Sequence, residues 1–305
     1  MAHTVVLLST YNGQKYLQEQ LNSIWAQTYE GRITVLIRDD GSRDDTVSIV
    51  ESYPCTQQRQ IQLIRAENIG VRRSFLELIH EAAPADYYFF ADQDDVWDPD
   101  KISAAVEAMA DQQGPVAWCS NYRLTDMALK PYRQALEAAP QFTPLQILFY
   151  NQIPGCVMGF NRALMVLVQK LQVENAMMHD SLVLAFAAAC GQVLYDPNPR
   201  ISHRIHGENV VGDGHKKIVL HKWIPEKLKL LFGKEDYDMS QIAGQYLEVA
   251  GAQIHPKFRD DLELLRDFKR SRKNTRKLLQ HPDTQGSLRN RTVLSIRCKI
   301  FFHIF

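Results

Sequence analysis

The sequence lacks the signatures of several common site types. Neither GxGxxG nor GxxxxGK[ST] occurs in the 305 residues, so neither a dinucleotide fingerprint nor a P-loop can explain nucleotide binding. The five cysteines form no CxxC pair, which fits a reducing compartment and argues against a cysteine-ligated zinc site. No apolar run approaches the ~20 residues of a membrane span. The longest run is Leu182 to Cys190, so we expect no bilayer-spanning helix.

The chain also lacks a net charge, but the charges are unevenly distributed. Residues 215–305 contain 19 Lys and Arg against 10 Asp and Glu, so this part carries a charge of +9 and residues 1–214 carry −9. Hydrophobic residues make up 45% and charged residues 23%, which excludes wholesale disorder. The length fits one large domain or a domain with a substantial appendage. A basic tail on an acidic body favours contact with anionic lipid or nucleic acid.

The first 120 residues alternate between strand and helix patterns. The predicted strands are residues 4–9, 33–38, 61–64 and 87–90. The first follows the N-terminus directly, with no basic leader, so we expect a strand there and not a signal peptide. Helical patterns separate the strands, as where Leu17, Leu21 and Ile24 share one face. This alternation predicts an α/β fold with a mostly parallel sheet covered by helices.

Polar motifs follow each of these strands. They are STYNG (9–13), DDGS (39–42), ENIG (67–70) and ADQDD (91–95). Ligands of parallel sheets bind beyond the carboxyl ends of the strands, so we expect the four loops to converge on one crevice. Taken singly, Gly13, Gly41 and Gly70 are better explained as turn glycines.

The fourth motif is the most acidic. Three carboxylates, Asp92, Asp94 and Asp95, follow an apolar strand within four residues, and only Lys101 nearby could neutralise them. Carboxylates this close repel one another, so a divalent cation is a natural partner. The alternative is a solvated loop that caps the next helix, because Asp98-Pro99-Asp100 is a helix-opening sequence.

The pattern becomes less regular after Pro115. We expect strands at 116–119, 153–160 and 192–195, a long polar connection through Pro144, and helices at 162–171 and from about 178 to 190. Asp180, in the first turn of the last helix, is either a partner of the helix dipole or a general base. His206 lies beside Gly207 in a loop that suits ligation, although loop histidines often only form hydrogen bonds.

The composition shifts again beyond Gly214. Residues 215–232 interleave apolar side chains with lysines, residues 269–277 contain six cations, and residues 293–305 are apolar with scattered cations. This pattern is typical of a helical region that binds an anionic membrane surface. There are two alternatives for this region. It could form a solvated helix that packs on the core, or it could bind nucleic acid.

Together these motifs resemble glycosyltransferase family 2, the inverting nucleotide-sugar-dependent transferases of GT-A fold. The resemblance rests on STYNG, DDGSRDDT (39–46), ENIGVRRSF (67–75), ADQDDVW (91–97), PGCVMGFNRAL (154–164), HD (179–180) and HGENVVG (206–212). Within the family, DQDDVW with a late HGxNVVG resembles bacterial rhamnosyltransferases of surface-polysaccharide synthesis. Ala91 stands where many relatives carry Ser, and HRIHGEN replaces a tyrosine-bearing version, which leaves the donor preference open.

The resemblance implies a role for each motif residue. Contacts to the nucleotide sugar are expected from Thr10, Tyr11, Asn12, Asp39, Asp40, Gly41, Ser42, Asn68, Gly70, Asp92 and Gln93. Ligands of Mg²⁺ or Mn²⁺ are expected from Asp92, Asp94 and His206, with Asp94 the main one. Asp180 would be the catalytic base, and Trp97, Gly155 and His179 would contact the acceptor. The domain would comprise residues 1–114 as nucleotide-sugar-binding half and 115–214 as acceptor half, followed by the extension 215–305.

The resemblance also implies partners and a location. The favoured donor is dTDP-rhamnose and the acceptor a saccharide or polyprenyl-linked saccharide, at the inner face of the cytoplasmic membrane. No Arg-Trp dipeptide occurs, so the QxxRW signature of processive relatives is missing and we expect one or a few sugars to be added. A UDP-hexose donor, or a catalytically silent scaffold for polysaccharide assembly, are the alternatives. The oligomeric state is left open.

Overall fold

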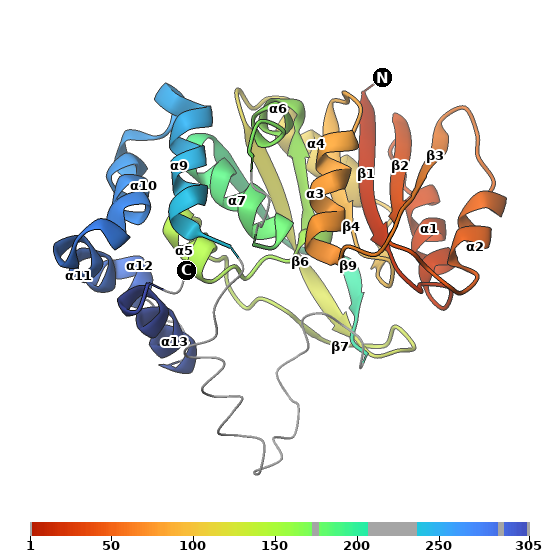
Figure 1. Ribbon diagram of the computed structural model, residues 1–305. Helices are drawn as coiled ribbons and strands as arrows, with labels where there is room; N and C mark the ends of the chain where they lie inside the picture. Colours follow the sequence, from red (N-terminus) through yellow and green to blue (C-terminus); the bar gives the residue numbers. More distant parts are fainter. Residues whose placement is uncertain (1, 173–176, 207–236, 286–289, 304–305) are drawn as a thin grey trace, which may run out of the picture. The chain divides into compact units, whose positions relative to one another are not determined.

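The computed structural model describes residues 2–172, 177–206, 237–285 and 290–303 (Figure 1). The chain divides into two compact units. The first comprises residues 1–140, 153–169 and 191–210, and the second comprises residues 141–152, 170–190 and 211–305. The predicted domain boundary at residue 214, and the predicted amphipathic segment 215–232, lie outside the described residues.

The first unit is built on a nine-stranded sheet with the strand order β3-β2-β1-β4-β8-β6-β9-β5, and β7 pairs with β6. The strands are β1 (His3–Thr10), β2 (Arg32–Asp39), β3 (Arg59–Arg65), β4 (Tyr87–Ala91), β5 (Val96–Trp97), β6 (Val116–Thr125), β7 (Pro131–Gln134), β8 (Met158–Asn161) and β9 (Gln192–Arg204). Strands β3, β2, β1 and β4 are mutually parallel, as are β6 and β9, whereas β8, β7 and β5 pair antiparallel.

Five helices flank this sheet (Figure 1). They are α1 (Leu17–Trp25), α2 (Thr46–Ser52), α3 (Val71–Glu81), α4 (Lys101–Ala110) and α6 (Arg162–Val168). Strands β1, β2 and β4 are buried almost throughout, as their near-continuous apolar sequences require when both faces are covered. The predicted α/β fold with a mostly parallel sheet flanked by helices is confirmed.

A close approach of strands explains one glycine. Phe89 of β4 pairs with Gly159 of β8, and a Cβ built on Gly159 would lie 2.5 Å from the Phe89 ring. Any larger residue there would displace a fully buried ring at the centre of the sheet.

Several predicted elements differ from the observed ones. Strand β6 continues to Thr125 and not only to residue 119, and helix α6 ends at Val168 and not at residue 171. The predicted strand 153–160 is a strand only from Met158 on, because Gly155–Val157 forms a 3₁₀ turn, η1. The polar connection through Pro144 contains β7, whose four exposed residues show no alternation by which a strand could be recognised. Strand β9 continues to Arg204 and not only to residue 195, since its second half pairs with β6 and β5.

The second unit is helical. Its helices are α5 (Pro144–Phe149), α7 (His179–Cys190), α9 (Met239–Ala250), η3 (Gly251–Gln253), α10 (Pro256–Asp267), η4 (Phe268–Arg270), α11 (Arg272–Gln280), α12 (Pro282–Gln285) and α13 (Asn290–Phe301). Helix α7 is buried along its whole length, where Phe186 stacks on Tyr246 with ring centroids 4.5 Å apart and the Tyr246 hydroxyl donates to the Leu182 carbonyl at 2.5 Å. The prediction of a helical C-terminal region is confirmed.

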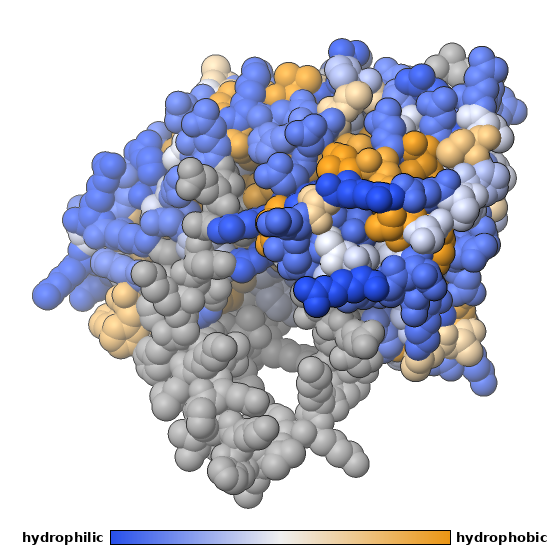
Figure 2. Space-filling model, turned by 45° about the vertical axis from the view of Figure 1, so that its right-hand side comes forward, coloured by the Kyte–Doolittle hydropathy of each residue, from blue (hydrophilic) through white to orange (hydrophobic). Residues whose placement is uncertain are grey.

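On the face drawn in Figure 2, hydrophilic residues cover most of the described surface, and hydrophobic residues emerge in separate patches. None of the helices in the described ranges combines the length and the apolar character that crossing a bilayer needs.

Candidate active site

The carboxyl ends of the central strands meet at one edge of the sheet. Thr10, the last residue of β1, pairs with Asp39, the last residue of β2, and the Asp40 amide donates to the Thr10 carbonyl at 2.8 Å. On the other side of β1, Leu8 pairs with Ala91 at the end of β4. The parallel register therefore brings the polar loops after β1, β2 and β4 together.

Gln93 joins the loop after β4 to the loop after β1. Its Oε1 accepts hydrogen bonds from Thr10 Oγ1 at 2.7 Å and from the Tyr11 amide at 3.0 Å. A Cβ on Gly13 would lie 2.3 Å from that same oxygen, so a larger residue there would displace the Gln93 amide from this position. The predicted site residues Thr10, Tyr11 and Gln93 thus form one connected group.

Asp39 retains an unused acceptor. Its Oδ2 accepts from the Ser42 amide at 3.0 Å, whereas its Oδ1 is buried and has no hydrogen-bond partner among the described residues. A buried carboxylate oxygen without a partner is costly, about 1–3 kcal/mol, so Asp39 Oδ1 is suited to accept from an N–H group of a ligand.

Asp40, in contrast, is engaged by the protein. It accepts from the buried Arg38 guanidinium and from the amides of Ile69 and Gly70, each at 2.9 Å. Gly70 has a φ of +85°, which glycine adopts without strain. Asp40 therefore holds the ENIG loop in place, and its predicted direct contact with the nucleotide stays a prediction.

The loops after β1 and β2 are also tied together. The Asn12 amide donates to Ser42 Oγ at 2.8 Å, and Asn12 Oδ1 accepts from the Arg43 amide at 2.9 Å. Gly41 has a φ of +83° and packs near the backbone of Asn68, 3.1 Å from where its Cβ would be. The predicted residues Asn12, Gly41, Ser42 and Asn68 thus form the rim of the edge, beside the exposed Tyr11 ring.

The acidic loop holds a second connected group. His206 Nε2 lies 2.7 Å from Asp94 Oδ2, and the His206 ring stacks on Tyr16 with centroids 5.1 Å apart. Burial, together with the charge of Asp95, raises the pKa of Asp94 above its usual range. An ionised carboxylate in these surroundings favours a cation nearby. The structure therefore brings the predicted metal ligands Asp94 and His206 together.

Asp95 forms a buried network that the motifs did not reveal. Its Oδ1 lies 2.8 Å from His203 Nδ1 and accepts from the Arg204 amide at 3.3 Å. Although burial opposes its charge, Asp95 raises the pKa of His203 to about 9, and His203 in turn holds the pKa of Asp95 below its usual range. Asp95 and His203 therefore form a charged pair at neutral pH.

Lys101 lies under the same loop. Its Nζ donates to the Cys156 carbonyl at 2.5 Å and sits 3.5 Å from the centre of the Trp97 ring. Burial lowers the pKa of Lys101 to about 7. Trp97 is itself buried in β5, where its ring contacts this lysine. Its predicted contact with an acceptor stays a prediction.

Two overlapping sets of side chains are candidates for a divalent ion. The predicted set is Asp92, Asp94 and His206. In the second set, ligand atoms of Asp92, Asp95, Cys156 and His203 all lie within 4.8 Å of one another. Asp95 is already paired with His203, and burial raises the pKa of the Cys156 thiol well above its usual value. Among the described residues, Asp92, Asp94 and His206 do not converge as such a group, so their predicted role as the metal ligands stays a prediction.

Arg204 connects three parts of the first unit. Its Nε donates to the Asp94 carbonyl at 3.1 Å and its Nη2 donates to Glu19 Oε2 at 2.6 Å. Its Nη1 donates to the Met127 carbonyl at 2.5 Å, and its guanidinium lies 4.7 Å from the centre of the Tyr16 ring. In the sequence, the one signal for Arg204 is its place in HRIH between two histidines, which does not indicate these contacts.

The other predicted residues lie in different surroundings. Gly155 is buried in the first unit at the start of η1. His179 and Asp180 open α7 of the second unit, where burial lowers the pKa of His179 to about 3 and Asp180 Oδ1 accepts from the Ser181 amide at 2.5 Å. The acceptor and base roles of these three residues stay predictions.

The Asp95–His203 pair gives a testable pH dependence of stability. The folded protein holds the pKa of His203 at about 9 against an ordinary 6.5. The stabilisation of the folded protein by charged His203 is complete below pH 6.5 and is lost as the pH rises to about 9. In EDTA, we expect the His203 contribution to the free energy of unfolding to fall by on the order of 2 kcal/mol across that window. The lowered pKa of Lys101 contributes with the opposite sign there, so the fall is obtained as the difference between wild type and His203→Gln. Denaturant titrations at several pH values measure it.

His203→Gln should remove most of this slope, because glutamine cannot carry the charge. His80→Gln, a change of an exposed histidine in α3, should keep the wild-type slope. Equal slopes in His203→Gln and wild type would exclude a charged Asp95–His203 pair.

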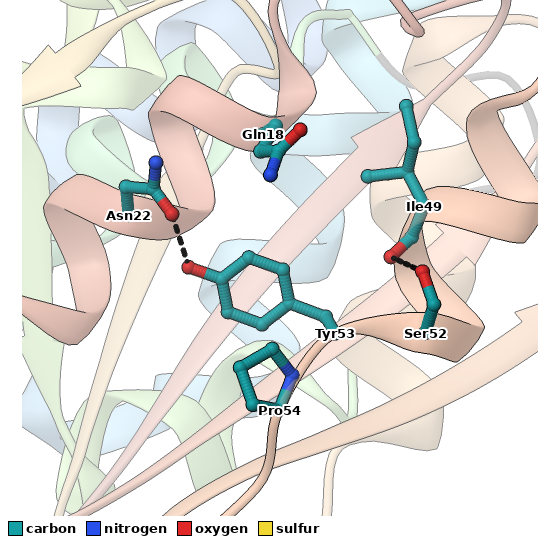
Figure 3. Close-up of a pocket in the computed structure, with 6 residues that line it drawn as sticks. All are labelled: Gln18, Asn22, Ile49, Ser52, Tyr53 and Pro54. Atoms are coloured by element: carbon teal, nitrogen blue, oxygen red, sulfur yellow. Dashed lines mark hydrogen bonds between the residues drawn. The ribbon is translucent and has the colours of Figure 1, made fainter.

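A small pocket lies elsewhere in the first unit, between α1 and α2 (Figure 3). Its volume is about 200 Å³, and the Tyr53 hydroxyl donates to Asn22 Oδ1 across it at 2.6 Å. Its lining residues are Gln18, Asn22, Ile49, Ser52, Tyr53 and Pro54. None of them belongs to the predicted site.

Comparisons of the sequence with known proteins agree with this geometry. The sequence profile of "Glycosyl transferase family 2" matches residues 5–168, more than half of the chain. The dTDP-rhamnosyl transferase RfbG of Shigella flexneri is 27% identical over 216 residues, which cover 67% of this chain and 73% of that relative.

Solved structures show the same fold. TarS of S. aureus in complex with UDP-GlcNAc matches with a TM-score of 0.58 and 18% identity, over 93% of this chain and 78% of that chain. The mannosyltransferase PcManGT of Pyrobaculum calidifontis, in complex with GDP-Man and Mn2+, matches with a TM-score of 0.54 and 18% identity, over 98% of this chain and 87% of that chain. These likenesses concern the fold, and they confirm the predicted GT-A fold.

Proposed function

The chain belongs to glycosyl transferase family 2, and from this premise we propose that it transfers a sugar, with inversion, from a nucleoside diphosphate sugar to a saccharide acceptor of surface-polysaccharide synthesis. The observation that carries the proposal is the meeting of two groups at one sheet edge: the unused Asp39 oxygen after β2 and the Asp94–His206 pair after β4. One suits a nucleobase and the other a metal-bound diphosphate.

The donor side follows from the loops after β1 and β2. Asp39 Oδ1 accepts the imide N–H of a uracil or thymine base, which satisfies the buried oxygen. Thr10 and the Tyr11 loop, fixed by Gln93, and the Asp40-anchored ENIG loop border the ribose. This arrangement selects the nucleotide more directly than the sugar.

The leaving side follows from the acidic loop. Asp92, Asp94 and His206 would hold Mg²⁺ or Mn²⁺, a hard ion that would stabilise the negative charge on the departing diphosphate. Arg204 fixes the backbone of Asp94, and the Asp95–His203 pair with Lys101 supports the loop from beneath. Asp180, on the resemblance of its HD motif, accepts the proton of the attacking hydroxyl.

The favoured donor is dTDP-rhamnose, since the relative RfbG, 27% identical, is named a dTDP-rhamnosyl transferase. A UDP-hexose is the runner-up, and the structural neighbour TarS was solved with UDP-GlcNAc. The acceptor is proposed to be a saccharide on a polyprenyl carrier at the inner face of the cytoplasmic membrane. A silent scaffold is the least favoured reading, because it would need neither the Asp94–His206 pair nor Asp180.

The experiment is release of free nucleoside diphosphate from a panel of nucleotide sugars, with Mg²⁺, Mn²⁺ or EDTA, using slow hydrolysis in place of the acceptor. Metal-dependent release from dTDP-rhamnose alone supports the proposal in full. Release from a UDP-hexose keeps the mechanism and overturns the donor. Absence of both release and donor binding across the panel would leave the scaffold.

Asp39→Ala tests the base contact. We expect the variant to bind dTDP or UDP about 10- to 100-fold more weakly, because the loss of a charged acceptor to a buried N–H costs about 1.5–3 kcal/mol. Titration calorimetry measures it. Binding of free Mn²⁺ should stay at the wild-type level, since the ligand set lies on another loop. Unchanged nucleotide affinity would exclude Asp39 as the base contact.

A further inference from the structure

Helix α11 presents a cationic face that the rest of the described chain leaves unneutralised. Arg272, Lys273, Arg276 and Lys277 are exposed, while Thr275 and Leu278 are buried against the unit. The spacing i, i+1, i+4, i+5 places the four cations on one side of the helix. None of the four forms an ion pair with a described residue, whereas the preceding Lys269 pairs with Asp238 at 2.9 Å.

Two exposed phenylalanines lie beside this helix. Phe301 and Phe302, at the end of α13, are 63% and 56% exposed and pack edge to face with centroids 5.0 Å apart. The next residue, His303, fixes them against α11, because its Nε2 lies 3.0 Å from Thr275 Oγ1 and its ring contacts Phe268. Because Thr275 lies within α11, this contact anchors the end of α13, with its two phenylalanines, beside that helix.

We propose that the α11 cations and the Phe301–Phe302 pair form a docking surface for an anionic lipid bilayer. Cations near such a surface are attracted to its negative charge, and the exposed rings can enter the headgroup region. Charge and apolar insertion are the two signals that stable peripheral binding requires. The inference does not depend on which donor or acceptor the enzyme uses.

Other occupants fit less well. A second copy of this chain would bring four like charges against four in a symmetric contact, which is repulsive. Single-stranded nucleic acid needs open ring faces on which bases stack, and the edge-to-face pair covers one of its two rings. A bilayer needs neither symmetry nor an open ring face.

The test is cosedimentation of the full chain with vesicles of phosphatidylcholine, with and without about one third phosphatidylglycerol. We expect binding to the anionic vesicles only, weakened by high salt. Replacing Arg272, Lys273, Arg276 and Lys277 with glutamine should weaken it about 100-fold or more. Phe301→Ala with Phe302→Ala should weaken it about tenfold, with less dependence on salt.

The control carries the same change of net charge. Replacing the exposed cations Lys130, Arg162, Lys170 and Lys257 with glutamine should leave vesicle binding near wild type. If both fourfold variants lose vesicle binding equally, net charge alone explains the binding and the proposed docking surface is wrong. Tighter binding to DNA than to anionic vesicles at the same salt would also overturn it.

Donor hydrolysis, measured on the same samples, should be unchanged in both fourfold variants, which shows that they are folded. Vesicle binding without any donor hydrolysis would sink the proposed function and leave the docking surface standing. Donor hydrolysis without vesicle binding would exclude the docking surface and leave the proposed function standing.

Discussion

Asp94→Asn is expected to lower metal-dependent turnover of the nucleotide sugar by about 10³-fold, or roughly 4 kcal/mol of transition-state stabilisation. The amide keeps the shape of the side chain and can still accept from His206, which lies 2.7 Å from Asp94 Oδ2. It lacks the charge that holds a hard cation, so both the ion and the stabilisation of the departing diphosphate weaken. Nucleoside diphosphate release across a Mn²⁺ titration measures the loss.

The stability of Asp94→Asn in the absence of metal should not fall with its activity. Burial and the charge of Asp95 raise the pKa of Asp94, so at neutral pH its ionised form opposes folding when no cation is present. In EDTA, the thermal midpoint of Asp94→Asn should be equal to or above that of wild type. A parallel loss of activity and stability would point to misfolding in place of a lost ligand.

Asp100→Asn is the matched control. Asp100 lies six residues further along, is largely exposed and forms a surface ion pair with Arg200. Such pairs contribute about 0–1 kcal/mol, so activity and midpoint should both stay near wild type. Wild-type turnover in Asp94→Asn itself would remove Asp94 from the metal site.

The edge of the sheet where the candidate site lies could be predicted because the sequence pattern of each strand and loop determines which residues reach that edge. Each of the first four strands is a short apolar run that ends in a polar motif, and parallel pairing places such ends together whatever the detailed packing. The positions of Thr10, Asp39 and Asp94 therefore predict that they lie at this edge, whereas their roles are implied by the family resemblance alone. The resemblance implies a ligand contact for Asp40 too, and the structure shows that its oxygens anchor Ile69 and Gly70.

The network beneath the acidic loop could not be predicted in this way. Asp95 is recognisable as a third carboxylate, but its partner His203 lies 108 residues away and meets it because the second half of β9 pairs with β6, where His203 lies opposite Leu124, and with β5. Strand β5 has only two residues, too few to be recognised in the sequence. Nothing in the sequence spacing distinguished His203 from His206, which faces Asp94 instead.

Asp180→Asn is expected to lower sugar transfer by about 10²- to 10⁴-fold while nucleotide-sugar binding stays near wild type. The substitution removes a proton acceptor and keeps the shape of the side chain, including the capacity to accept from the Ser181 amide. The nucleotide contacts proposed for Asp39 lie in the other compact unit, so they are untouched. Single-turnover transfer to an acceptor, beside calorimetry with the donor, separates the two quantities.

The pattern across substrates identifies the role. A base acts on the acceptor hydroxyl, so the transfer rate of Asp180→Asn should fall most with acceptors whose hydroxyl is a weak nucleophile. The slow hydrolysis of the donor, in which water replaces the acceptor, should also become slower. Asp260→Asn, an exposed carboxylate of α10 in the same unit, should change neither. Near-normal transfer by Asp180→Asn would leave Asp180 as a residue that only stabilises the first turn of α7, the role that its place beside the helix dipole would explain by itself.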